Sequence, residues 1–400
     1  MIKAFMQMSL SGIIVGILGM FMTPVLSRVY SPDSFGLFAL FCSITSYFSI
    51  VSSFRFEYAF FINKKHIDIY FFICIIIIIV SSVITSLFLP VIFNVNISSI
   101  LLFLGLLFSS FYNILTQFSV ALSKYKEISV ARILLGFIQY VSAIIFGVYF
   151  YDNGLLYAII TAQLVVSIYL YRKKNILYTG ISIKKICPIV KSNMKYCLNS
   201  TISSALQWAT PLAPVFIGNF IYEEGTIGTY FLLAQSFGAI FSIPRRSLIN
   251  IYTSEFNTIK NFRTNYDKVF MLLKQKKILL SLIFLSFSII CVFLYLYGVN
   301  IIGFVLGNSW ILGGKYVFAL FLFYSLEVLL FPFVHLLNLW GKYIDVLCIE
   351  ITRFFSLIIL LPYCMNYFDS PFYIYIFIHL FAMFIFNVIV FYRIIHYSKL

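Results

Sequence analysis

Long apolar runs separated by short polar breaks follow one another along the whole sequence. Their apolar positions are continuous and do not alternate with polar ones. A helix of about 20 apolar residues crosses the hydrocarbon core of a bilayer, whereas a β-barrel strand is about half that length and alternates. We therefore predict an all-α fold with twelve transmembrane helices, over residues 8–27, 35–54, 69–90, 98–122, 131–151, 155–171, 196–218, 226–244, 278–297, 316–338, 346–362 and 372–392.

Composition supports a membrane protein and excludes a soluble one. The 400 residues are 62% hydrophobic and only 10% charged, with a mean hydropathy of +1.01. Soluble domains are about a quarter charged, so this chain has too few polar residues to cover a water-facing surface. The first apolar run has no small-residue cleavage site, and we expect it to be a retained helix rather than a removed signal.

The lysines and arginines predict the orientation of the chain. If the N-terminus is cytoplasmic, all but two of the 28 lysines and arginines fall on the cytoplasmic side, and only Arg28 and Lys315 lie outside. This bias is the positive-inside rule, and it places both termini in the cytoplasm. The net charge of +15 is thus a topology signal, and nucleic acid is not an expected partner.

A short pattern occurs twice, 192 residues apart. Phe35-Gly36-Leu37-Phe38 aligns with Ile227-Gly228-Thr229-Tyr230, and each copy opens a predicted helix after an acidic turn. We therefore predict two six-helix bundles, residues 1–180 and 181–400. An even number of helices per bundle makes the two bundles parallel, an arrangement in which one half rocks against the other around a shared site.

Arginines at the ends of predicted helices are the candidate substrate-binding residues: Arg28, Arg55, Arg245 and Arg246. With the offset of 192, position 247 is the equivalent of Arg55 in the second copy and directly follows the Arg245-Arg246 pair. We therefore expect Arg55 and this pair to face each other across a cleft. The alternatives are an interfacial Arg28 paired with Asp33, and cytoplasmic anchors at the other three.

Two carboxylates are candidates for ion coupling, because ionisable groups within spans usually mark a pathway. Glu327 lies in the middle of a predicted helix, and Glu57 closely follows another. The alternative for Glu327 is a protonated acid bonded to a neighbouring hydroxyl. The sequence contains no C-x-x-C spacing, HExxH, P-loop or G-x-S-x-G, so we expect no enzyme, metal site or cofactor, and energy from a gradient of H⁺, Na⁺ or the substrate itself.

The stretch from residue 26 to 59 resembles the Wzx-type O-antigen flippases, members of the polysaccharide transporter branch of the superfamily that includes MATE exporters. That family begins with L-S-R-x-Y-S-P-x-x-F-G-x-x-A-L, followed by R-Y/F-E-x-A at the end of the second helix. The matching residues are Leu26, Ser27, Arg28, Tyr30, Ser31, Pro32, Phe35, Gly36, Ala39, Leu40, Arg55, Phe56, Glu57 and Ala59. The second half of the chain is only loosely patterned.

The resemblance implies a flippase of the bacterial inner membrane for undecaprenyl-diphosphate-linked oligosaccharide in lipopolysaccharide synthesis. Its expected partners are the lipid-linked oligosaccharide, membrane lipids, and the polymerase and chain-length regulator of the same pathway. Arginine suits such a substrate, because its planar fork matches phosphate oxygens.

Three other functions remain as alternatives. A MATE-like, ion-coupled exporter of organic cations would share the fold but would need an acidic and aromatic site. A membrane glycan polymerase or ligase would need a large outer loop, and the predicted outer loops are short. A purely structural membrane protein would give no reason for charges at paired helix ends.

Overall fold

The structure is a computed structural model. It describes residues 2–62, 67–93, 97–173, 214–258 and 277–339, together with single helical residues at 194, 197, 200, 201, 204, 205, 208, 209, 212, 348, 351, 355, 359, 388 and 392. The chain divides into two compact units, Met1–Gly228 and Thr229–Leu400. The predicted bundle boundary near residue 180 lies outside the described residues.

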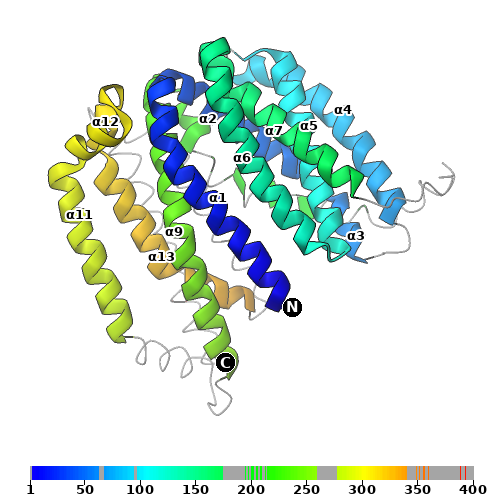
Figure 1. Ribbon diagram of the computed structural model, residues 1–400. Helices are drawn as coiled ribbons and strands as arrows, with labels where there is room; N and C mark the ends of the chain where they lie inside the picture. The colour runs from blue at the N-terminus through cyan, green and yellow to red at the C-terminus, as the bar shows by residue number, and fades with distance from the viewer. Residues whose placement is uncertain are drawn as a thin grey trace. The chain divides into compact units, whose positions relative to one another are not determined.

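Every regular element that the structure describes in the first unit is helical, as Figure 1 shows. The elements are α1 (Ile2–Val29), α2 (Pro32–Val51), η1 (Phe56–Tyr58), α3 (Ala59–Ile62), α4 (Ile67–Phe93), α5 (Ser99–Ala121), α6 (Tyr125–Phe150), η3 (Tyr151–Asn153) and α7 (Gly154–Arg172). Helix α6 packs against both α1 and α7, and α5 packs against α2, α4 and α7.

The described part of the second unit is also helical. Its elements are α9 (Glu224–Thr258, of which residues 224–228 belong to the first unit), α11 (Lys277–Leu306), η4 (Asn308–Trp310), α12 (Ile311–Gly314) and α13 (Val317–Leu339). Helix α11 packs against α12 and α13. Its other side exposes apolar side chains such as Leu282, Phe284 and Leu285, as expected of a surface that faces lipid.

Within the described residues, six helical stretches are long and apolar enough to cross a membrane, or seven if the bent pair Asn308–Gly314 and Val317–Leu329 forms one span. One stretch, Tyr125–Arg172, contains both α6 and α7. The protein is thus a multi-pass membrane protein. The predicted spans at 346–362 and 372–392 lie almost wholly outside the described residues, so the total of twelve stays a prediction.

Several predicted boundaries are wrong. The helices predicted to begin at 8 and 131 begin at Ile2 and Tyr125, and the one predicted to end at 297 ends at Leu306. Two further differences concern arginines. The helix predicted to end at Pro244 continues to Thr258, because a proline inside a helix removes one hydrogen bond without always ending it. The helix predicted to reach Phe54 ends at Val51, where the backbone turns sharply. Both differences move arginines relative to helix ends.

The core of the first unit combines apolar clusters with polar contacts between helices. Phe60, Phe71 and Phe118 pack edge to face in one buried cluster. Between α2 and α5, the Ser52 hydroxyl contacts that of Ser110, and the Asn113 amide donates to the Ser49 carbonyl. Small and hydroxylated residues allow this close approach of helices in an apolar medium.

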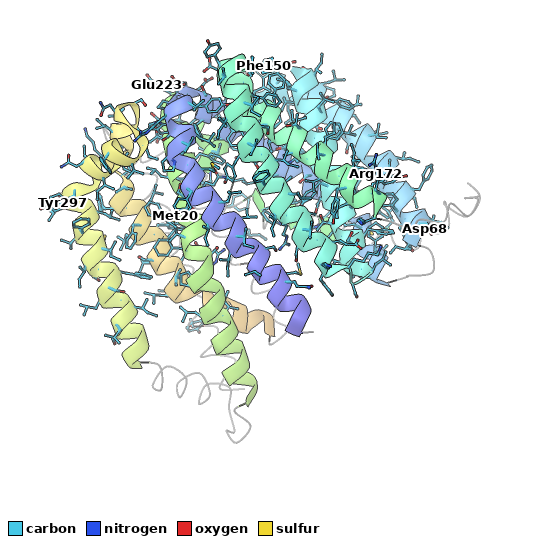
Figure 2. The ribbon with its side chains drawn as sticks, in the orientation of Figure 1. Met20, Asp68, Phe150, Arg172, Glu223 and Tyr297 are labelled. Carbon is cyan, nitrogen blue, oxygen red and sulfur yellow. The ribbon has the colours of Figure 1, made fainter. Side chains whose placement is uncertain are left out.

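Figure 2 shows how the loops of the first unit divide between its two ends. Phe150 and Glu223 lie toward one end of this unit, and Asp68 and Arg172 lie toward the other. This arrangement matches the prediction from the sequence, in which the loops near residues 152 and 223 both lie on the outer side of the membrane. Which end is cytoplasmic stays a prediction from the charge bias.

Candidate substrate and coupling sites

Arg55 and Glu57 form a buried ion pair in the first unit. The Arg55 Nη1 atom lies 3.2 Å from Glu57 Oε1, and the two side chains are 8% and 0% exposed. Arg55 Nε also donates a 2.9 Å hydrogen bond to the hydroxyl of Ser204. The Ser53 hydroxyl bonds to the second carboxylate oxygen of Glu57. The carboxylate and guanidinium therefore each have a second polar partner, which a buried ion pair needs to offset its desolvation.

An unusual turn positions this pair. Helix α2 ends at Val51, and Phe54 and Arg55 both adopt positive φ, 47° and 57°. Non-glycine residues in the left-handed region cost of order 1–3 kcal/mol each and persist only where surrounding contacts hold them. Here the turn leaves Phe54 exposed and directs Arg55 inward, where its bonds to Glu57 and Ser204 retain it.

Arg245 and Glu327 form a second ion pair, within the second unit. The Arg245 Nη1 atom lies 2.8 Å from Glu327 Oε1, and the side chains are 33% and 13% exposed. Arg245 follows Pro244 inside α9, and Glu327 lies in the interior of α13. A carboxylate at such a position is costly without a partner, and the guanidinium supplies one. The Arg245 side chain keeps more exposed surface than that of Arg55.

Aromatic side chains form a cluster about one helical turn before Arg245 in α9 and Glu327 in α13. Phe241 stacks on Tyr324, with ring centroids 6.1 Å apart and an interplanar angle of 16°. The members of this aromatic cluster, which joins α9, α11 and α13, are Phe237, Phe241, Phe287, Phe321 and Tyr324. The charged pair therefore borders an apolar, ring-lined region.

The other predicted binding residues have different places. Arg28 is exposed in the last turn of α1, where a cation interacts favourably with the helix dipole. The side chain of Arg246 lies outside the described residues. Both carboxylates predicted for ion coupling are partners of predicted substrate-binding arginines. Binding and coupling roles of all six residues stay predictions.

Sequence reasoning missed Ser53 and Ser204 because single serines carry no recognisable pattern in apolar runs. It also missed the pairing of Arg245 with Glu327, which are 82 positions apart. The sequence shows that Arg245 and Glu327 are charged positions within apolar helices. Only the packing of α9 against α13, however, shows that the two side chains meet. No group of three or more metal-ligating side chains occurs within the described residues.

Comparison with solved structures identifies the fold. A multidrug resistance MATE family transporter of the MOP superfamily in an inward-facing conformation aligns with a TM-score of 0.68, at 13% identity, covering 99% of both chains. A multidrug resistance MATE family transporter of the MOP superfamily in an outward-facing conformation gives 0.55 at 15% identity, covering 99% of this chain and 96% of that one. A MOP superfamily transporter from Pyrococcus furiosus, described as having a binding pocket of reverse polarity that suggests a different function, gives 0.56 at 15% identity, covering 98% and 95%.

No protein-family model matches the sequence, and the search of curated proteins found no match. The structural likeness extends over nearly the whole chain, so the fold is that of MATE transporters.

Proposed function

We propose that this protein is a flippase that moves undecaprenyl-diphosphate-linked oligosaccharide from the cytoplasmic to the outer leaflet by alternating access. The MATE-like fold supports a membrane transporter in general. The choice of an anionic, lipid-linked substrate rests on the chemistry of the charged residues and on the motif between residues 26 and 59.

The observation that carries the proposal is the partly exposed guanidinium of Arg245 among apolar helices. A diphosphate and a sugar chain cannot cross hydrocarbon unaided, since burying an isolated charge costs tens of kcal/mol by Born estimates. A fixed arginine lowers this cost, because one guanidinium–phosphate contact gains about 4 kcal/mol at an effective dielectric near 20. The polyprenyl tail can remain in the lipid.

The carboxylate partners give these sites a defined resting state. Glu327 contacts Nη1 of Arg245, and Glu57 contacts Nη1 of Arg55, so each carboxylate holds one of the donors that a phosphate could use. In the proposed cycle, protonation of Glu327 frees this donor of Arg245 for the substrate. In this scheme Glu327 links a coupling ion to substrate binding, which is the role that its depth in α13 suggests.

An ion-coupled exporter of organic cations is the second candidate. It is favoured by the aromatic cluster beside Glu327, since rings and a carboxylate attract organic cations. Against it, Glu327 and Glu57 each already contact an arginine, which lowers the local negative charge. One neighbour of this fold is described as having a binding pocket of reverse polarity that suggests a different function, so the fold alone does not favour organic cations.

The test is substitution of the paired arginines in the native host. We expect Arg245→Gln to stop surface glycan display and to retain lipid-linked glycan on the cytoplasmic leaflet, at normal protein level. Arg55→Gln should stop display as well, and its display is compared at matched protein level because this variant leaves the buried Glu57 without its partner. Arg172→Gln removes an exposed arginine at the end of α7 and is the matched control. Normal display in both pair variants, or drug sensitivity in place of a glycan defect, would exclude the flippase role.

A further inference from the structure

The two copies of the repeated pattern have the same backbone geometry. Before α2, the Tyr30 amide donates to the Leu26 carbonyl at 2.9 Å, and that of Phe35 donates to Ser31 at 3.2 Å. Before and within α9, Tyr222 donates to Gly218 at 2.8 Å, and Ile227 donates to Glu223 at 3.3 Å. Donors and acceptors are all related by 192 residues, so the resemblance seen in sequence extends to the fold of the turn.

These two turns also touch each other, and they do so reciprocally. A Cβ added to Gly36 would overlap the carbonyl of Glu224, and one added to Gly228 would overlap the carbonyl of Pro32. Residues 32 and 224, and residues 36 and 228, are equivalent positions of the repeat. Gly36 meets Glu224, and the equivalents of these two residues, Gly228 and Pro32, meet in the same way. Such a reciprocal contact is the signature of a two-fold axis. All these residues lie in the first unit.

The two-fold axis passes close to residues that are equivalent to each other, namely Gly36 with Gly228 and Asp33 with Gly225. A Cβ added to Gly228 would lie 2.5 Å from the amide nitrogen of Gly36, and one added to Gly225 would lie 2.6 Å from Asp33 Oδ1. Because Cβ atoms almost never approach other atoms within 3.0 Å, these glycines are what allows the two backbones to meet. At Gly36 and Gly228 the contact is therefore made by main chain against main chain, while Gly225 lies against the side chain of Asp33.

We propose that the contact between residues 32–36 and 224–228, here called the glycine seal, closes one end of the transport path and separates once in every cycle. An axis through the seal relates the first turns of α2 and α9, so parting them would open a symmetric entrance. The charge bias predicts that this is the outer end. The inference rests on the proposed function only in that a transporter must open this end to release cargo.

The surroundings of the seal suit a contact that must come apart. The carboxylates of Asp33 and Glu224 stand in the first turns of the two helices. Asp152, which accepts a hydrogen bond from the Ser34 hydroxyl, adds a third. Like charges repel across the contact, while backbone packing and two helix N-termini favour it. The opposing effects keep the closed state from being overwhelmingly stable.

The test needs no substrate. In the full chain reconstituted in nanodiscs, with the seven native cysteines replaced by alanine, spin labels are placed at Asn153 and Glu223, which are exposed in the first unit. Their distance distribution is measured in three backgrounds: no further change, Gly228→Ala, and Gly16→Ala. A Cβ on Gly16 would meet nothing within 4 Å, so Gly16→Ala controls for the loss of a glycine.

We expect Gly228→Ala to add a longer-distance population or shift the main one, because its methyl group and the Pro32 carbonyl must separate to about 3.5 Å or more. Gly16→Ala should leave the distribution unchanged. An unchanged distribution in Gly228→Ala would overturn the proposal. A longer distance together with normal glycan display would keep the seal and overturn the flippase function instead.

A second measurement covers the case in which Gly228→Ala does not fold. The double variant Asp33→Cys with Gly225→Cys, in the cysteine-free background, should form a disulfide under mild oxidant. The crosslink should remove any long-distance population, and reductant should restore it. Failure of the pair to crosslink would show that the two turns do not meet, and a crosslink without effect on the distances and on glycan display would show that they do not part. Either result would overturn the proposal.

Discussion

At the scale of single residues, the two ion pairs differ in how much protein surrounds them. Arg55 is almost fully enclosed, whereas a third of the Arg245 side chain is exposed. Removing one member of a buried pair leaves the other as an uncompensated charge and costs about 3–5 kcal/mol, while a partly exposed partner can be hydrated. How deeply each pair is buried therefore determines how much its glutamate contributes to the stability of the fold.

We predict that Glu57→Gln destabilises the protein much more than Glu327→Gln. Loss of the Glu57 charge should lower stability by about 3 kcal/mol or more, seen as a clear drop in the midpoint of thermal unfolding in detergent. Glu327→Gln should change that midpoint little and should alter transport instead. Equal midpoints for the two variants would contradict this reading of burial.

Glu224 should make the stability of the glycine seal depend on pH. Burial raises the pKa of its carboxyl, and the nearby Asp33 and Asp152 raise it further. A carboxyl whose pKa is raised on folding stabilises the fold fully below its unfolded pKa of about 4.5, and this contribution is lost as pH rises through the folded pKa.

The corresponding variant is Glu224→Gln, which mimics the protonated form. We expect it to raise the thermal midpoint relative to wild type at pH 7 and to give no difference near pH 4. Using the difference between the two proteins cancels the titration of all other carboxyls. A difference that grows toward low pH would mean that the charged form of Glu224 is the stabilising one.

At the scale of elements, residues 30–36, which follow the first helix, mainly form the turn that leads into α2. Ser31 caps α2 by accepting from the Ser34 amide, and Pro32 occupies the first helical turn. The Tyr30 hydroxyl donates a 2.6 Å hydrogen bond to the Ala143 carbonyl and so fastens the turn to α6. Gly36 then permits the contact with Glu224.

We predict that Tyr30→Phe lowers stability by about 0.5–1.5 kcal/mol, since it removes one buried hydrogen bond and leaves the ring in place. Thermal unfolding in detergent measures the loss. Tyr47→Phe, also in the first unit, serves as the comparison, and it should have a smaller effect if the bond to Ala143 matters. An effect of Tyr30→Phe no larger than that of Tyr47→Phe would mean that the turn is held by packing alone.

Much of the helical framework was predictable because continuous apolar runs determine it directly. The prediction of 98–122 corresponds to α5 at Ser99–Ala121, and 316–338 to α13 at Val317–Leu339. The turn at Phe54 and Arg55 was not predictable, since left-handed φ at bulky residues arises from tertiary contacts rather than from local preference. For the same reason, the partners of Arg55 and Arg245 could not be assigned from sequence.

At the scale of the whole molecule, the loops of the first unit sort into two faces, and the sorting allows a direct test of orientation. Cysteines introduced at Lys124 and at Glu223 should react with a membrane-impermeant thiol reagent from opposite sides. We expect Glu223→Cys to be labelled in intact spheroplasts and Lys124→Cys only after the membrane is opened. The reverse result would invert the predicted topology and place the glycine seal at the cytoplasmic end.

Helix α9 carries both the second glycine of the seal and the arginine of the second ion pair. Its 35 residues extend about 52 Å, and Gly228 and Arg245 are about 26 Å apart along it. If the backbone stays straight up to Pro244, a tilt of only 5° about one of these positions would carry the other through roughly 2 Å. A rotation of this one helix would therefore act both on the contact of Arg245 with Glu327 and on the backbone contact at Gly228.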